Sequence, residues 1–182
     1  MTADRSRLLP LAALLALAAA CGPTPEAKAP PSQPARQLQA CSLLREDDAA
    51  AALGEPANAM SSVLSGAKGS DPLQCAYNGG ISDPPKTLSL LIRPADSPAA
   101  ARRLYDATRS GLNSLGTGAP EDVPHLGDAA FWVGGQLNQL HVLKAELNLI
   151  LTLQPGAPTD PQHPPDVKAI STVVAGKVLG RL

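Results

Sequence analysis

Cysteine is the residue type in this chain with the most specific chemistry, and it occurs at Cys21, Cys41 and Cys75. The spacings form no C-x-x-C pair, and no histidine stands near a cysteine at the spacing of zinc ligands. Zinc binding and thioredoxin-like redox chemistry are therefore disfavoured. In an exported protein the simpler interpretation is a disulfide between Cys41 and Cys75, which would join the first predicted helix to the first predicted strand.

The three histidines are the next candidates for catalysis or metal binding. His125 and His163 stand in proline-flanked loops, and His141 stands inside a predicted strand. No two of them share a local motif, and none is close to a nucleophile signature such as G-x-S-x-G. The sequence therefore predicts no catalytic residue, no metal and no cofactor.

The aromatic pair Phe131–Trp132 contains the strongest candidate for a binding residue. Neighbours in a strand face opposite ways, so one ring is expected in the core and the other exposed or covered by a helix. An exposed Trp132 is a candidate contact with a partner protein. Packing in the core is the alternative, and the sequence favours it.

Composition and charge exclude some partners. The chain has 182 residues, which predicts one domain, with 15 basic and 16 acidic residues. The basic residues are scattered, and only four residues are aromatic. Neither an electrostatic footprint nor a stacking platform for nucleic acid is present, so nucleic acid is not an expected partner.

The first 20 residues have the pattern of an export signal. Arg5 and Arg7 precede an apolar run, Leu8 to Ala20, which is interrupted only by Pro10. A basic start, a short apolar segment and small residues before a cut site are typical of secretory signals. The run is too short for the roughly 20 residues that a transmembrane helix needs.

The residues before Cys21 resemble the lipobox of bacterial lipoproteins, in which small residues precede an acylated cysteine. Here the sequence is Leu17-Ala18-Ala19-Ala20-Cys21, with leucine one position further out than the family usually has it. The alternative is ordinary cleavage after Ala20, which would leave a free thiol at Cys21. The expected location is therefore the cell envelope, lipid-anchored on the outer side of the cytoplasmic membrane or to the outer membrane, with stable attachment by several acyl chains such as palmitate.

Residues 21–38 are predicted to be the lipidated cysteine and a disordered tether. The segment holds five prolines and almost nothing large and apolar. It cannot bury enough surface to offset the entropy of ordering, and proline keeps it extended. The expected result is a domain, residues 39–182, held clear of the bilayer.

The sequence of the domain predicts an α+β fold, in the order helix, two strands, helix, three strands, helix. Three acids before an alanine run closed by Gly54 predict a short helix, with the acids, Glu46 to Asp48, complementing its dipole. Alternation from Leu147 to Leu153 predicts a strand in a three-stranded meander, and Val167, Ile170, Val174 and Val178 lie at helical period. We expect an antiparallel sheet of about five strands with the helices packed on one face.

Several short motifs resemble small actinobacterial lipoprotein domains, in particular family 3558 of domains of unknown function. The motifs are Cys41-Ser42-Leu43-Leu44 with Asp47-Asp48 and Ala52-Leu53-Gly54, then Cys75-Ala76-Tyr77, then Leu126-Gly127-Asp128-Ala129-Ala130-Phe131. The domain is also similar to extracellular sensor domains attached to some actinobacterial serine/threonine kinases. The resemblance implies a paired Cys41 and Cys75 and a mixed helix-and-sheet fold, but it supplies no catalytic residues. Ala145 stands where a hairpin glycine is often seen, which leaves the register after Leu143 open.

The predicted function is a non-catalytic, membrane-anchored domain that binds a small ligand or an envelope protein. Two alternatives remain from the sequence alone. One is an envelope enzyme whose site is assembled from distant residues, and the other is a structural or assembly accessory. A deep pocket with convergent polar groups would favour ligand binding or catalysis, whereas a flat apolar patch at Trp132 would favour a protein partner.

Overall fold

The structure is a computed structural model of the chain, and it describes residues 38–60, 71–81, 83–114, 118–157 and 162–182. The predicted signal, Cys21 and the tether up to residue 37 lie outside the described residues. The domain contains helices and a seven-stranded antiparallel sheet, so the α+β prediction is confirmed. The expected number of about five strands is too low.

The strands follow the order β1-β2-β3-β7-β6-β5-β4 across the sheet. Their bounds are β1 Ala57–Ala59, β2 Leu73–Gly79, β3 Thr87–Pro94, β4 Glu121–Asp122, β5 Ala129–Val133, β6 Gln139–Lys144 and β7 Leu147–Gln154. The predicted meander is β5, β6 and β7, each paired with its neighbour in the chain. β3 pairs with β7 along its whole length, which joins the first hairpin to the meander.

In the described residues, four helices accompany the sheet: α1 Ala40–Leu43, α2 Glu46–Leu53, α3 Pro98–Ser114 and α4 Val167–Leu179. The acids at the start of α2 and the left-handed Gly54 after its end lie where the sequence predicted them. The N-terminal segment forms two helices rather than one, because Leu44 and Arg45 both take extended backbone conformations.

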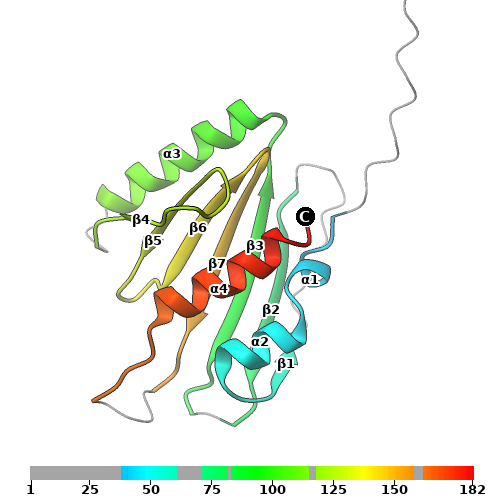
Figure 1. Cartoon of the computed structure of the whole chain (residues 1–182), viewed down its shortest axis with the longest axis vertical. Helices are drawn as coiled ribbons and strands as arrows, with labels where there is room; N and C mark the ends of the chain where they lie inside the picture. Colours follow the sequence, from blue (N-terminus) through cyan, green and yellow to red (C-terminus); the bar gives the residue numbers. More distant parts are fainter. Residues whose placement is uncertain (1–37, 61–70, 82, 115–117, 158–161) are drawn as a thin grey trace, which may run out of the picture. The chain divides into compact units, whose positions relative to one another are not determined.

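The helices lie on both faces of the sheet, so the expectation that they pack on one face is wrong. α1, α2 and α4 pack on one face, with Leu88, Leu90 and Leu151 in the core beneath them. α3 packs on the other face, where its Ala101 and Tyr105 are buried among strand residues of opposite parity. Figure 1 shows α4 crossing the central strands near α1 and α2, with α3 apart from the other three helices.

The disulfide between Cys41 and Cys75 is present, and it ties α1 to β2. Its Cα atoms are 5.1 Å apart, and Cys75 is almost fully buried in the main core. The Tyr77 hydroxyl, two residues further along β2, donates to the Leu44 carbonyl oxygen at 3.3 Å. The N-terminal helices are therefore held to the sheet by a covalent bond and a hydrogen bond side by side.

The Leu126-Gly127-Asp128 segment closes against the β6–β7 hairpin, which explains its residue types. Gly127 has a φ of +63°, and a Cβ there would lie 2.5 Å from the Leu143 carbonyl oxygen. The Asp128 carboxylate accepts from the backbone N–H of Ala145 at 2.6 Å and from Lys144 Nζ at 3.1 Å. Ala145 has a φ of +50°, the conformation in which a hairpin glycine is usual. Asp128 holds this turn in place, and the register pairs Leu143 with Asn148.

Candidate functional site

The two faces of the sheet differ in how fully they are covered. Under α1, α2 and α4 the strand residues are almost all buried and apolar. On the opposite face α3 lies over β5, β6 and β7, and the residues of β2 and β3 on that side remain mostly half-buried. This second face is the candidate functional site, because its side chains are polar and reachable.

We call its exposed part the open face. It consists of half-buried or exposed residues that alternate with core residues along five strands: Asn58, Gln74, Asn78, Thr87, Ser89, Leu91, Arg93, Gln139, Ile150, Thr152 and Gln154. Eight of them carry amides or hydroxyls, two are aliphatic and one is cationic. These residues lie on one side of the sheet because residues two apart in a strand point to the same side.

Cross-strand pairing aligns these residues in rows. One row runs from Ser89 through Thr152 to Gln139, and the next runs from Gln74 through Leu91 and Ile150. Directly paired side chains in adjacent strands have Cβ atoms about 4.5–5.5 Å apart. Neighbouring rows therefore present hydroxyl and amide groups on one side of an aliphatic pair, within the span of a single small ligand.

The second of these rows ends in a buried aromatic stack. His141 follows Ile150 across the sheet, and its ring stacks on Phe131 with centroids 4.5 Å apart. Tyr105 of α3 meets Phe131 edge-on at 5.0 Å. His141 Nε2 lies 3.2 Å from Gln139 Oε1. Burial, together with the positive charge of Arg93, lowers the pKa of His141 to about 4, so the ring is neutral at pH 7 and braces α3 against the sheet.

Arg93 is the charged member of the open face. It pairs across the sheet with Asn148, beside the point where α3 begins. No ion pair with a carboxylate is found for Arg93 among the described residues, whereas the exposed Arg102 and Arg109 pair with Asp106 and Asp122. An arginine whose charge has no carboxylate partner is available to bind an anion.

Within the described part of the chain, two buried polar atoms on this side of the sheet have no hydrogen-bond partner. They are Asn148 Oδ1 and the Tyr105 hydroxyl oxygen, both beneath α3. The Asn148 side chain still donates from Nδ2 to the Ala101 carbonyl oxygen at 3.1 Å. Burial raises the pKa of Tyr105 to about 12, so its hydroxyl stays protonated. On the other face, the buried Ser171 Oγ of α4 is likewise without a hydrogen-bond partner among the described residues.

The structure places the predicted candidates in several different parts of the molecule. Trp132 is 6% exposed and packs in the main core, while its neighbour Phe131 is buried on the opposite face. The surroundings of Trp132 therefore match the packing alternative. His125 and His163 lie exposed in loops, away from the buried His141.

The acids at the start of α2 have unequal roles. Glu46 and Asp47 are exposed in the first turn, as expected for residues that complement the helix dipole. Asp48 is 1% exposed and forms ion pairs with Arg181 and, at 3.2 Å, with Lys177 of α4. Sequence reasoning missed this pairing, because its partners lie more than 120 residues away.

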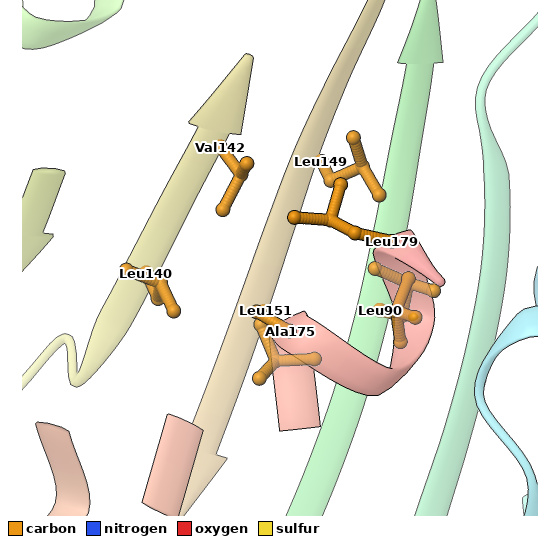
Figure 2. A pocket seen from close by; sticks show the side chains of 8 residues that line it. Leu90, Leu140, Val142, Leu149, Leu151, Ala175 and Leu179 are labelled. Atoms are coloured by element: carbon orange, nitrogen blue, oxygen red, sulfur yellow. The ribbon is translucent and has the colours of Figure 1, made fainter. Parts of the chain in front are cut away.

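Neither of two cavities lined by described residues is a deep polar pocket. Figure 2 shows aliphatic side chains of the sheet and of α4 around a space of about 10 Å³, among them Leu140, Leu151 and Ala175. That volume is close to the minimum for one water molecule, and the lining is apolar. A hollow of about 270 Å³ lies beside Arg109, Asn113 and Pro120, where the Arg109 charge is already bound to Asp122 at 2.5 Å.

Searches for related proteins and for metal or membrane features gave negative results. No family model, curated protein or solved structure matches the chain. Within the described ranges, no three His, Cys, Asp or Glu side chains come together as a metal-binding group. No helix in that part of the chain is long and apolar enough to cross a bilayer. The open face and the sequence of the first 21 residues are therefore the features of this chain that bear on its function.

Sequence reasoning did not identify the open face. A signal was present in the strands, since Ser89 and Thr152 each alternate with leucines. Ser89 and Thr152 are brought side by side by the pairing of β3 with β7, which are more than 50 residues apart in the sequence. Local patterns do not carry that information.

Proposed function

We propose that this chain is a lipid-anchored binding protein of the cell envelope, acylated at Cys21, that uses the open face to hold a ligand without catalysis. The observation that carries the proposal is the unequal covering of the sheet, which leaves a polar, half-buried surface whose Arg93 has no carboxylate partner among the described residues. Binding sites combine apolar contact area with a small number of placed polar groups. The open face has both.

Two further observations support the location. The bond between Cys41 and Cys75 is typical of oxidising compartments such as the bacterial cell envelope. The basic start, the apolar run and the small residues before Cys21 together form the pattern of a lipoprotein signal. The described domain begins close to the end of the proline-rich segment, so the tether would lead directly into α1.

We expect Cys21→Ser to abolish attachment to the membrane. Without the thiol no acyl chain can be added, and each buried methylene contributes about 0.8 kcal/mol to membrane binding. The measurement is detergent-phase partitioning of the full chain, with mass spectrometry of the mature N-terminus. Cys41→Ser/Cys75→Ser serves as the control, since it replaces two cysteines rather than one and leaves Cys21 in place. Unchanged cleavage and membrane association in the Cys21→Ser protein would overturn the lipid anchor.

The binding face is tested by photo-crosslinking in bacteria that export the full chain. A benzophenone amino acid replaces Ser89, which is half-buried on the open face, or Val173, which is 62% exposed on α4. We expect an adduct at Ser89 that is absent at Val173, because only the open face holds a ligand. The mass of the adduct then gives its chemical class. Equal or absent crosslinking at the two positions would contradict the proposal.

A further inference from the structure

The hydrogen-bonding groups of the open face share one property. Its eight uncharged polar side chains are amides and hydroxyls, which both donate and accept hydrogen bonds: Asn58, Gln74, Asn78, Thr87, Ser89, Gln139, Thr152 and Gln154. A phosphate or carboxylate only accepts, and a surface built for several such groups would be rich in lysine and arginine. Groups that both donate and accept are matched by ligands with hydroxyl and acetamide groups.

The centre of the open face supplies an apolar surface of small size. Leu91 and Ile150 are directly paired across β3 and β7, and both are half-buried. The polar row through Ser89 and Thr152 lies next to them. A sugar ring has the same division, with C–H groups on its face and hydroxyls around its edge. The C–H face can cover the aliphatic pair while the hydroxyls reach the neighbouring row.

The charge of the open face selects among sugars. The whole chain has a formal net charge of −1, yet no Asp or Glu occupies a position on this side of β1, β2, β3, β5, β6 or β7. Arg93 is the cation at one end of the face, and the buried His141 is neutral at pH 7. A guanidinium binds a carboxylate through two parallel hydrogen bonds. A carboxylate on the sugar would complement this end of the face.

From these features we infer that the ligand of the open face is an acidic glycan, a sugar chain that carries carboxylates. Its carboxylate is bound by Arg93, its ring covers Leu91 and Ile150, and its hydroxyl and acetamide groups bond to Ser89, Thr152 and Gln139. The inference rests on the proposed function, because it names the ligand class of the same surface.

The test is a titration of the full chain, purified in detergent and labelled with ¹⁵N, with two matched sugars. N-acetylmuramic acid carries a carboxylate, and N-acetylglucosamine has the same ring and acetamide without it. We expect both to shift amide resonances of β3 and β7, and the acidic sugar to bind at least about tenfold more tightly, as one charge-assisted pair implies. Arg93→Gln removes the difference between the sugars, whereas Arg103→Gln, on the exposed surface of α3, preserves it.

A second variant tests the hydroxyl contacts separately. Ser89→Ala/Thr152→Val removes two hydroxyls with little change of shape, and it should weaken the binding of both sugars by a similar factor. If neither sugar shifts the amide resonances of β3 and β7, the glycan inference is wrong. In that case a crosslinked molecule of another class at Ser89 would still support the proposed binding function. If the advantage of the acidic sugar survives Arg93→Gln, the role of Arg93 is wrong. Failure of both crosslinking and titration removes the binding face itself.

Discussion

Replacing both disulfide cysteines, as Cys41→Ala/Cys75→Ala, should lower the free energy of unfolding by about 4 kcal/mol. The bond closes a loop with a sequence separation of 34, and the chain-entropy model assigns roughly that stabilisation to such a loop. Cys75 also packs in the main core, so the alanine adds a small loss of apolar contact. The measurement is urea unfolding of the full chain in detergent, monitored by the fluorescence of Trp132, which lies in the core.

The matched control is the native chain treated with a reductant. Reduction leaves both side chains in place, so it isolates the loop constraint from the loss of packing. We expect the reduced chain to lose most of the same stability, with the midpoint moving in the same direction. A double variant as stable as the oxidised native chain would show that α1 is held to β2 by packing alone.

Asp48→Asn should cost about 3 kcal/mol, the second-largest loss that we expect. The buried carboxylate pairs with Arg181 and Lys177 and also accepts from the Arg45 backbone N–H at 3.3 Å. Removing the charge leaves two cations beside each other without their anion, and breaking a buried pair in this way is strongly destabilising. Both cations are partly exposed, which places the expected loss at the lower end of the usual range.

Asp47→Asn is the control, because Asp47 is the exposed neighbour of Asp48 in the same helical turn. It removes the same charge and the same dipole complement but not the buried pairs. We expect it to change stability by less than about 1 kcal/mol. Similar losses for Asp47→Asn and Asp48→Asn would mean that α2 is stabilised by its overall negative charge rather than by the pairing with α4.

The Asp48 interaction also fixes the direction of a pH dependence. The hydrogen bond from Arg181 holds the pKa of Asp48 below its ordinary value, with Lys177 acting in the same direction. A carboxyl with a lowered pKa in the folded state contributes stability above its unfolded pKa and loses it as the pH falls further. The stability difference between the native chain and Asp48→Asn should therefore be constant near neutral pH and shrink below about pH 4. A difference that stayed constant to pH 2 would contradict this assignment.

These two connections both involve the first helices of the described domain, and one of them joins those helices to the last residues of the chain. The disulfide attaches α1 to β2, while Arg181 bonds to Asp48 and, at 2.6 Å, to the Leu43 carbonyl oxygen. The segment that follows the proposed tether is thus bound to both the sheet and the last residues of the chain. A domain pulled through its N-terminus would load these bonds before it loaded the sheet.

The strand with the clearest sequence pattern is β7, on which burial imposes alternation. β7 alternates between leucines and other residues because one of its sides lies in the main core, and the pattern is visible without any partner. β1 and β4 escaped prediction for the opposite reason. β1 is three residues long with a single buried residue, Ala57, and β4 consists of the exposed Glu121 and Asp122, so neither is long enough to show an alternating pattern. Both strands form by pairing with the edge of a longer neighbouring strand, β2 for β1 and β5 for β4.

The position of α3 and the open face could not be predicted for a related reason. Only Ala101 and Tyr105 of α3 are buried, and a helical period shows that a helix has an inner side without showing which face of a sheet it meets. Because α1, α2 and α4 lie on the other face and α3 covers only part of this one, Ser89 and Thr152 remain half-buried. The open face is thus a property of strand order and helix placement, both of which are set by contacts between distant parts of the chain.

The most direct test of the binding face is hydroxyl-radical footprinting of the unmodified chain in its native membrane and after extraction and washing in detergent. If the open face holds a ligand, oxidation of Leu91 and Ile150 is lower in the membrane than after extraction, while oxidation of the exposed Val173 on α4 is the same in both. Leu91 and Ile150 that oxidise equally in both preparations, relative to Val173, would show that this surface carries no ligand in the envelope.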